Sequence, residues 1–268
     1  MVIDHNDGLL AWARDAFPGA RVVPNTRARG ESGARNSGVA EVSSDIVAFL
    51  DDDATAEPDW LSHLVHWYDA PDVLGVGGAA HPRWSSGRPP WFPAEFDWVV
   101  GCVYEGLPAE PSTIRNLMGC NMSFRRQVIL DAGGFWEGLG RTGGDASGCS
   151  ETEFCIRAKA QLGGRFVFDP QARIAHQVPA DRATWRYFAK RCRAEGRSKA
   201  RLAHRAGPSD ALSLERRYVR QTLPRGIAAG VRQVGRDPGA AWRVAALVLG
   251  TTFTVSGYAV GRASKQTD

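Results

Sequence analysis

Short apolar runs alternate with segments of helical period over the first 80 residues. The apolar runs are bounded by turn-forming residues and are too short for helices, which is typical of buried strands. Strands that alternate with helices indicate an α/β fold with a mostly parallel sheet. We therefore predict strands at 1–3, 20–24, 46–50 and 73–79 and helices at 9–16, 33–42 and 57–68.

The pattern changes twice further along the chain. Residues 81–115 are rich in Trp, Pro and Gly and have no clear period, which predicts a long loop that its tryptophans keep ordered. From about residue 183 the pattern is helical throughout. The chain is thus expected to comprise an α/β domain over 1–180 and a basic, helical appendage over 181–268. Between these parts we predict strands at 116–124, 165–169 and 173–177 and helices at 126–132 and 151–161.

Positive charge is concentrated in one stretch. Residues 182–236 contain 15 Arg and Lys but only three acids, whereas the net charge of the whole chain is +4. Such a block favours an anionic partner such as membrane headgroups, diphosphates or nucleic acid. Coding bias is the alternative, since the chain has 29 Arg and only four Lys. No nucleic-acid recognition motif accompanies the block, so nucleic acid is not predicted as a partner.

An apolar segment follows the basic block. Residues 244–261 are 18 uncharged residues, which is at the short limit for a membrane-spanning helix. A helix buried in the protein, an interfacial helix and a spanning helix all fit this composition, which includes several Gly and Thr. Together with the basic block, the segment predicts contact with a membrane surface. Five cysteines without a CxxC pair indicate reduced thiols and a cytoplasmic location.

Three consecutive carboxylates, Asp51, Asp52 and Asp53, follow the apolar strand predicted at 46–50. Ligands of open α/β sheets bind at the carboxyl ends of the strands. Alternate residues of an extended chain point to the same side, so Asp51 and Asp53 are placed to hold one cation together. Oxygen ligands suit Mg²⁺ or Mn²⁺, which bridge nucleotide phosphates. A solvated acidic turn is the alternative.

Three motifs in order resemble family 2 glycosyltransferases of the GT-A fold. They are GESGARNSGVAEVSSDIVAFLDDDATAEPDWL at 30–61, GCNMSFRRQVILDAGGF at 119–135 and SETEFCIR at 150–157. The resemblance covers residues 1–180. It implies an inverting, metal-dependent transfer of a sugar from a nucleoside-diphosphate donor to an acceptor hydroxyl. The acceptor is expected to be a lipid-linked or cell-envelope glycan, at the inner face of the cell membrane.

The same resemblance assigns residues to the donor. Asp4 matches the aspartate that hydrogen-bonds the nucleotide base, and Arg35 would approach the base or the phosphates. Asp52 would contact the ribose or the sugar, and Asn121 lies in the second motif, which belongs to the nucleotide-sugar site. These four residues are the expected nucleotide-sugar contacts, together with Asp51.

The resemblance also implies a metal centre and a base. Asp51 and Asp53 form the DxD pair, and His176 matches a histidine that completes the metal sphere in some relatives, although a lone histidine is more often structural. Counting back from Arg157 places the catalytic base at Glu151. The alternative is that Glu151 only stabilises the beginning of a helix, where acidic residues are favourable.

One departure from the family pattern concerns the beginning of the chain. The family's first strand and helix precede the strand that contains Asp4, and here Met1 falls inside that second strand. The domain over 1–180 is therefore expected to be truncated at its N-terminal end. A catalytically weak, GT-A-like binding or scaffold protein is accordingly the alternative function.

Overall fold

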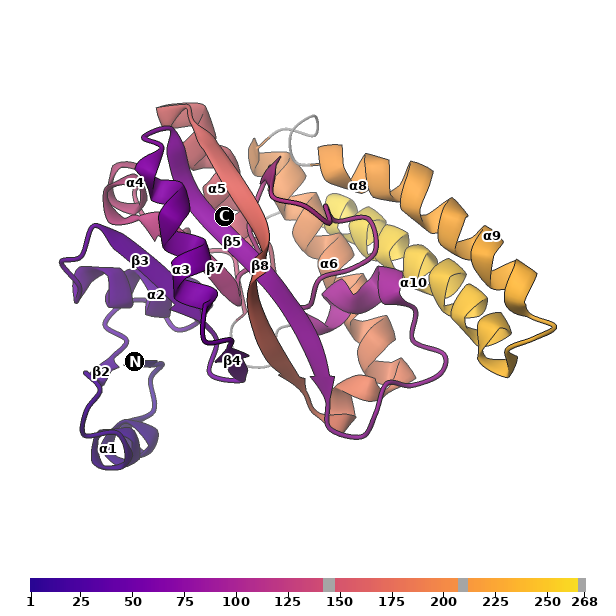
Figure 1. Ribbon diagram of the computed structural model, residues 1–268, viewed down its shortest axis with the longest axis horizontal. Coiled ribbons are helices and arrows are strands. Elements are labelled where there is room, and N and C mark those ends of the chain that lie inside the picture. The colour runs from indigo at the N-terminus through magenta and orange to yellow at the C-terminus, as the bar shows by residue number, and fades with distance from the viewer. Residues whose placement is uncertain (142–147, 207–211, 265–268) are drawn as a thin grey trace.

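The computed structural model describes residues 1–141, 148–206 and 212–264. A mixed β-sheet forms its centre, with helices on both faces (Figure 1). The C-terminal helices gather at one side of the sheet. The first helix and its two short strands lie at the opposite end, below the sheet in this view.

The first 24 residues form a small unit of their own. Strands β1 (Val2–Ile3) and β2 (Val23–Pro24) pair in parallel around helix α1 (Asp7–Ala16). This helix begins at Asn6, whose side-chain oxygen accepts a hydrogen bond from the Leu9 amide at 2.9 Å, as expected of an N-cap residue. Ile3, Ala13 and Val22 form its buried centre. In the described structure, neither strand pairs with the main sheet.

The main sheet has six strands and runs in both directions. Its order is β3-β7-β5-β8-β4, with β6 also pairing β8. Among the described pairings of this sheet only β5 with β8 is parallel, but β3, β5 and β8 all run the same way, because β7 lies antiparallel between β3 and β5. The strands are β3 (Ile46–Leu50), β4 (Ala54–Ala56), β5 (Val73–Trp84), β6 (Ser112–Ile114), β7 (Asn121–Arg125) and β8 (Arg165–Val178).

Helices cover the two faces of this sheet and bury different clusters. Helix α3 (Trp60–Val65) and the 3₁₀ turn η1 (His66–Asp69) bury Leu64 and Tyr68 against β5 and β8. A phenylalanine-rich cluster lies between β7 and the helices α2 (Glu31–Ala40), α4 (Arg126–Asp131) and α5 (Ser150–Leu162). Its aromatic members are Phe124, Phe135, Phe154 and Phe166.

The C-terminal helices share a core with the segment that follows β5. Phe92 and Phe96 from this segment pack with Phe188 and Leu247 of the helices. Because the side chains interdigitate in one buried cluster, the helices are fixed against the sheet rather than tethered to it. The elements are η2 (Ala94–Val100), η3 (Ala180–Ala183), α6 (Trp185–Ala206), α8 (Ser213–Arg217), the π-helix η4 (Tyr218–Thr222), α9 (Leu223–Gln233) and α10 (Pro238–Ala263).

The α/β class and the C-terminal helices are confirmed, but the sheet is mixed rather than mostly parallel, because β4, β6 and β7 each pair antiparallel with their neighbours, and several local predictions differ. Residues 81–115 contain η2, β6 and the end of β5, because the tryptophans pack in the shared core: Trp91 stacks on Trp185 with ring centroids 4.0 Å apart. The two strands predicted at 165–169 and 173–177 form the single strand β8, whose pairing with β5 shifts in register between them. The boundary at residue 180 stays a prediction.

The backbones of helices α6 and α10 are in direct contact at two glycines. A Cβ atom built on Gly257 would lie 2.1 Å from the carbonyl oxygen of Arg193, and one on Gly196 would lie 2.0 Å from that of Thr254. Glycine at these positions is therefore required by space, because any side chain would push the two helices apart. The contact keeps α10 in place although it is long and apolar enough to cross a membrane, with 22% of its apolar window buried.

We expect Gly257→Val to destabilise the protein by about 1–3 kcal/mol, the usual cost of overpacking a close contact. Thermal unfolding followed by circular dichroism measures the change. Ser256→Val is the matched control, because Ser256 is exposed on the same helix and the substitution introduces the same β-branched residue. Equal melting temperatures for the two variants would contradict the backbone contact between α6 and α10.

Candidate active site

Three predicted metal ligands come together at one edge of the sheet. Asp51 follows β3, Asp53 precedes β4, and His176 lies in β8. The pairing of Ala54 with His176 in the β4–β8 ladder brings Asp53 beside the imidazole. One ligand atom from each of the three residues lies within 4.8 Å of the others. Two carboxylates and an imidazole are a donor set that suits Mn²⁺ or Mg²⁺.

Basic side chains hold Asp53 in its charged form. His176 Nε2 lies 3.1 Å from Asp53 Oδ1, and Arg182 Nη1 lies 3.4 Å from Oδ2. Burial tends to raise the pKa of Asp53, but the hydrogen bond and charge of His176 and the charge of Arg182 outweigh it, so the pKa is lowered. The other imidazole nitrogen, Nδ1, lies 3.8 Å from the sulfur of Cys102, which is fully buried.

Asp51 and Asp52 differ from Asp53 in their surroundings. Burial raises the pKa of Asp51, helped by the nearby carboxylates of Glu31 and Asp53 and opposed by Arg35. A raised pKa marks a carboxyl group that gains from a nearby cation. Asp52 is exposed at the tip of the turn. The three consecutive acids therefore divide into two that converge on His176 and one that faces solvent.

The predicted base-recognition residue, Asp4, lies at the end of β1 beside the beginning of α2. Its carboxylate accepts hydrogen bonds from the Gly30 amide at 3.0 Å and from Asn25 Nδ2 at 2.7 Å. His5 Nδ1 lies 2.8 Å away. Burial acts to raise the pKa of Asp4, but these hydrogen bonds lower it overall. The side chain is 34% exposed, so part of the carboxylate is open to a ligand.

Arg35 joins three parts of the site. It projects from α2, donates from Nη2 to the carbonyl of Gly119 at 3.1 Å and donates from Nη1 to Ser150 Oγ at 3.1 Å. It also forms an ion pair with Glu31 one turn earlier on α2. The guanidinium is buried and fixes the turn before β7 and the beginning of α5 relative to α2. Contact with a donor nucleotide stays a prediction for Arg35, as it does for Asp4.

Asn121 is fully buried and its side-chain amide is engaged within the protein. Its Nδ2 donates to the carbonyls of Ala79 and Ala172 at 3.2 and 2.9 Å, and its Oδ1 accepts from Trp60 Nε1 at 2.8 Å. These bonds connect β7 with β5, β8 and α3 in the middle of the sheet. A contact of Asn121 with a nucleotide sugar also stays a prediction, and it would require some of these bonds to break.

Two glutamates at the beginning of α5 have different environments. Glu151 lines a cavity, and Thr152 Oγ1 donates to its Oε1 at 3.5 Å. Burial, and then the charge of Glu31, raise the pKa of Glu151. Glu153 instead accepts from Arg157 Nε at 2.9 Å and from Arg205 Nε at 3.4 Å. The two glutamates are two residues apart, yet only Glu151 is available to a ligand.

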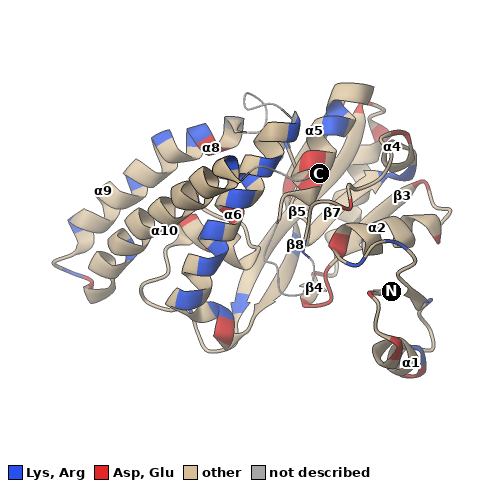
Figure 2. Cartoon of the chain, turned by 180° about the vertical axis from the view of Figure 1, so that it is seen from behind, with Lys and Arg blue, Asp and Glu red and all other residues tan. Residues whose placement is uncertain are grey.

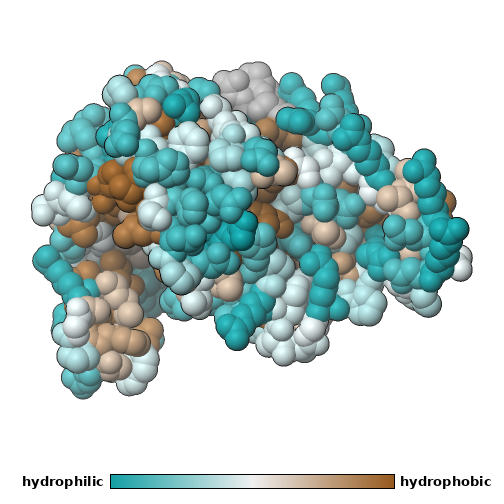
Figure 3. Space-filling view, viewed as in Figure 1, coloured by the Kyte–Doolittle hydropathy of each residue, from teal (hydrophilic) through white to brown (hydrophobic). Residues whose placement is uncertain are grey.

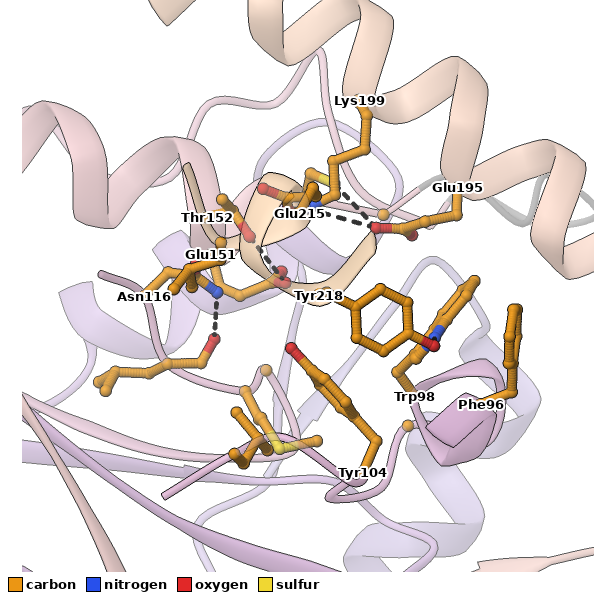
Figure 4. Close-up of a pocket in the computed structure, with 18 of the residues that line it drawn as sticks. Phe96, Trp98, Tyr104, Asn116, Glu151, Thr152, Glu195, Lys199, Glu215 and Tyr218 are labelled. Atoms are coloured by element: carbon orange, nitrogen blue, oxygen red, sulfur yellow. Dashed lines mark hydrogen bonds and ion pairs between the residues drawn. The ribbon is translucent and has the colours of Figure 1, made fainter. Parts of the chain in front are cut away.

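The cavity that Glu151 lines has a volume of about 290 Å³ and extends beneath the C-terminal helices. Asp51, Glu151 and His176 all contribute to its wall, so the candidate metal group and the candidate base face the same space. Aromatic side chains from η2, from the loop that follows it and from η4 close one side of it (Figure 4). They are Phe96, Trp98, Tyr104 and Tyr218.

Comparison with known proteins identifies the family. The model of "Glycosyl transferase family 2" matches residues 2–132. A glucosyl-dolichyl phosphate glucuronosyltransferase of Haloferax volcanii is 37% identical over 203 residues, which are 74% of this chain and 65% of the relative. Residues 2–132 of this chain belong to glycosyltransferase family 2. The succinoglycan biosynthesis protein ExoM of Rhizobium meliloti is 30% identical over 63% of this chain and 52% of its own length.

A solved structure has the same fold. It is the mannosyltransferase PcManGT from Pyrobaculum calidifontis in complex with GDP-Man and Mn²⁺. Its TM-score is 0.59 with 18% identity, and the match covers 99% of this chain and 77% of the other. The match confirms the GT-A fold for this chain. The chain spans about half to two thirds of the length of the relatives quoted above.

An ion cluster in this glycosyltransferase was not predicted from the sequence. Lys199 Nζ lies 2.7 Å from Glu215 Oε1 and 3.5 Å from Glu195 Oε1 (Figure 4). Arg115 donates to both oxygens of Glu215 at 2.9 and 3.0 Å, and Arg191 pairs with Glu195 at 3.0 Å. All five residues line the cavity. Burial would raise the pKa of Glu215, but Lys199 and Arg115 lower it to about 2.

A sequence signal for this cluster existed in the basic stretch. Glu195 and Glu215 are two of the three acids among its 15 basic residues, and Arg191, Glu195 and Lys199 follow one another at intervals of four on α6. That spacing places them on one face of a helix. Figure 2 shows basic residues, in blue, along α6 and α9. The partners Arg115 and Glu215 are 100 residues apart, so their contact has no local signal.

We expect Asp53→Ala to weaken Mn²⁺ binding by tenfold or more, because it removes one of two carboxylates from the group. Isothermal titration calorimetry with MnCl₂, with and without UDP or GDP, measures the change. Asp52→Ala is the matched control, since it removes the neighbouring exposed carboxylate and should bind as the wild type does. Equal losses in both variants would mean that the turn attracts the ion only through its net charge.

Proposed function

We propose that this protein transfers a sugar from a nucleoside-diphosphate donor to an acceptor hydroxyl with inversion at the anomeric carbon, and that it depends on a divalent ion. One observation carries the proposal: the Asp51–Asp53–His176 group and Glu151 are joined through one cavity. A leaving diphosphate and an attacking hydroxyl need these two kinds of group on opposite sides of the reacting carbon. Membership of family 2 supports this assignment.

The donor half of the proposal rests on the metal group and on Asp4. Asp51, Asp53 and His176 would hold the ion, which would neutralise the negative charge that develops on the leaving diphosphate. Asp4 has a partly exposed carboxylate at the end of β1 and would accept a hydrogen bond from the base. Mn²⁺ is the first ion to test, because the mannosyltransferase of the same fold was solved with GDP-Man and Mn²⁺.

Glu151 is the proposed general base. Its carboxylate takes the proton of the acceptor hydroxyl while the acceptor oxygen bonds to the anomeric carbon, and the bond from that carbon to the diphosphate breaks with its electrons leaving on the diphosphate. One displacement of this kind inverts the anomeric configuration. The raised pKa of Glu151 makes its carboxylate a stronger base than an exposed glutamate. Glu153 is unsuited to this role because Arg157 and Arg205 hold it.

The proposed acceptor is a lipid-linked glycan at the inner face of the cell membrane. Trp242, Leu249 and Val260 are 63%, 42% and 56% exposed on α10. Their spacing of 7 and 11 residues places them along one side of the helix, where they would enter the lipid interface. On the face shown in Figure 3, hydrophilic residues cover most of the end formed by α8 and α9. The Haloferax volcanii relative acts, by its name, on a glucosyl-dolichyl phosphate.

The function is tested by incubating the protein with Mn²⁺ and a panel of UDP-, GDP- and dTDP-sugars and measuring the nucleoside diphosphate released. With the donor so identified, Glu151→Gln should lower kcat by at least about 100-fold, the usual loss with a general base. In the wild type kcat should fall as the pH drops through the raised pKa of Glu151, above the ordinary value of 4.5, because the protonated carboxyl cannot accept a proton.

Glu153→Gln is the control for this experiment. It removes the same charge two residues away and breaks the pairs with Arg157 and Arg205, so it should lower the melting temperature while the folded protein keeps its kcat. A folded Glu153→Gln variant that is inactive, beside an active Glu151→Gln variant, would reverse the assignment of the base. Release of no diphosphate from any donor would favour a binding or scaffold role.

We expect the double variant Trp242→Ser/Leu249→Ser to lose most of its binding to anionic vesicles, because two apolar side chains leave the proposed lipid-facing side of α10. Co-sedimentation with phosphatidylglycerol vesicles at low salt measures it. Leu61→Ser/Val65→Ser is the matched control, with two exposed apolar residues on α3. Binding that is unchanged in the α10 variant, or a wild-type protein that stays in the supernatant, would exclude α10 as the membrane contact.

A further inference from the structure

One buried guanidinium in the cavity lacks partners for part of its donor set. Arg191 is only 7% exposed, yet its Nε and Nη1 have no hydrogen-bond partner among the residues that the structure describes. Its Nη2 alone is accounted for, by the ion pair with Glu195. A buried, unsatisfied charged donor is costly, so its hydrogen bonds are normally completed by a ligand, an ion or ordered water.

Arg191 lies in the part of the cavity that the proposed base also faces. Both Arg191 and Glu151 contribute to the wall, and the charge of Arg191 helps to lower the pKa of Glu31, which also lines the cavity. The pKa of Glu151 is raised in turn by Glu31 and Glu195. A group bound at Arg191 would therefore share the cavity with the hydroxyl that Glu151 would deprotonate.

The charge around Arg191 is complementary to an anion. In the cluster described above, the three cations Arg115, Arg191 and Lys199 face the two carboxylates of Glu195 and Glu215. Both carboxylates have lowered pKa values, because the cations outweigh the effect of burial, so both are charged at neutral pH. An anion bound at the unpartnered donors of Arg191 would therefore lie beside the cations of this cluster, Lys199 among them.

The wall beside this cluster is apolar. Side chains from the β6 region and from α8, η4, α9 and α10 line it: Leu107, Ile114, Leu214, Val219, Leu223 and Val255. Burying a hydrocarbon chain against such a surface lowers the free energy more than burying a sugar, because most edges of a sugar are polar. An anion-binding group and an apolar wall in the same cavity together suit an amphipathic ligand with a charged head.

We propose that Arg191 binds the phosphate that joins the acceptor sugar to its lipid, and that the apolar wall covers the first part of the lipid chain. The inference rests on the proposed transfer to a lipid-linked acceptor and names the group by which that acceptor is recognised. Nε or Nη1 of Arg191, which lie on different edges of the guanidinium, donates a charge-assisted hydrogen bond to a phosphate oxygen. The sugar hydroxyl then lies toward Glu151.

Farnesyl phosphate and farnesol test the proposal, because they differ only in the phosphate. We expect the wild-type protein to bind farnesyl phosphate at least tenfold more tightly than farnesol in detergent micelles, measured by microscale thermophoresis. Arg191→Gln should remove that preference, since a neutral amide cannot supply a charge-assisted hydrogen bond. Arg193→Gln, an exposed arginine on the same helix, is the control and should keep it.

A second variant separates recognition from folding. Arg191→Lys keeps the positive charge beside Glu195 but has a single ammonium in place of the guanidinium's separate donor nitrogens. It should fold with a near-native melting temperature and retain only part of the preference for farnesyl phosphate. Binding of UDP or GDP with Mn²⁺ should be the same in all variants, because Arg191 is not in the metal group. Equal preference in wild type, Arg191→Gln and Arg191→Lys would overturn the proposal.

Two further probes decide between sources of the anion. Inorganic phosphate that binds as tightly as farnesyl phosphate would overturn the lipid-linked part of the proposal. A loss of UDP-glucuronate binding in Arg191→Gln, with farnesyl phosphate binding intact, would assign Arg191 to a carboxylate of the donor instead. These are binding measurements, so a protein that shows the preference but no transfer disproves the proposed function alone, and one that transfers without the preference disproves this inference alone.

Discussion

The buried ion cluster of Arg115, Arg191, Glu195, Lys199 and Glu215 is the interaction on which the site depends. It connects the segment before β7 to α6 and α8, which are separated in sequence by up to 100 residues. It adds ionic contacts to the apolar core and to hydrogen bonds such as those from Tyr218 to the carbonyl of Glu95 at 2.8 Å and from Arg243 to that of Pro90 at 3.1 Å, which also hold the C-terminal helices over the cavity. The five charged side chains are buried and each has only a few partners. They therefore fix the position of α6 and α8 over the cavity.

Much of the candidate metal group and of the helix that carries Glu151 could be predicted from the sequence, because the sequence patterns that indicate them are local. The strand 46–50, the acids that follow it and the helix that begins at residue 150 are each contained within a short window. The prediction that Asp51, Asp53 and His176 form one group came from the family resemblance, and the β4–β8 pairing explains it physically. Counting back from Arg157 selects Glu151 on α5, and Glu151 does line the cavity.

The rest could not be predicted, because its contacts join distant parts of the chain. Nothing near Arg115 indicates that it meets Glu215, and nothing near Asn121 indicates that its amide is used by Trp60, Ala79 and Ala172. The tryptophans after β5 have no period that would reveal their partners. Their packing against α6 is decided by the shape of the whole core, which a one-dimensional pattern does not contain.

The five cysteines have a practical consequence that follows from where they lie. All are buried, with no disulfide, and they belong to different clusters: Cys155 to the core over β7, Cys102 and Cys192 to the core under the C-terminal helices. Burial raises the pKa of each thiol and keeps it neutral. A thiol reagent can therefore label each cysteine only when its own region opens, so the order of labelling records which part of the molecule unfolds first.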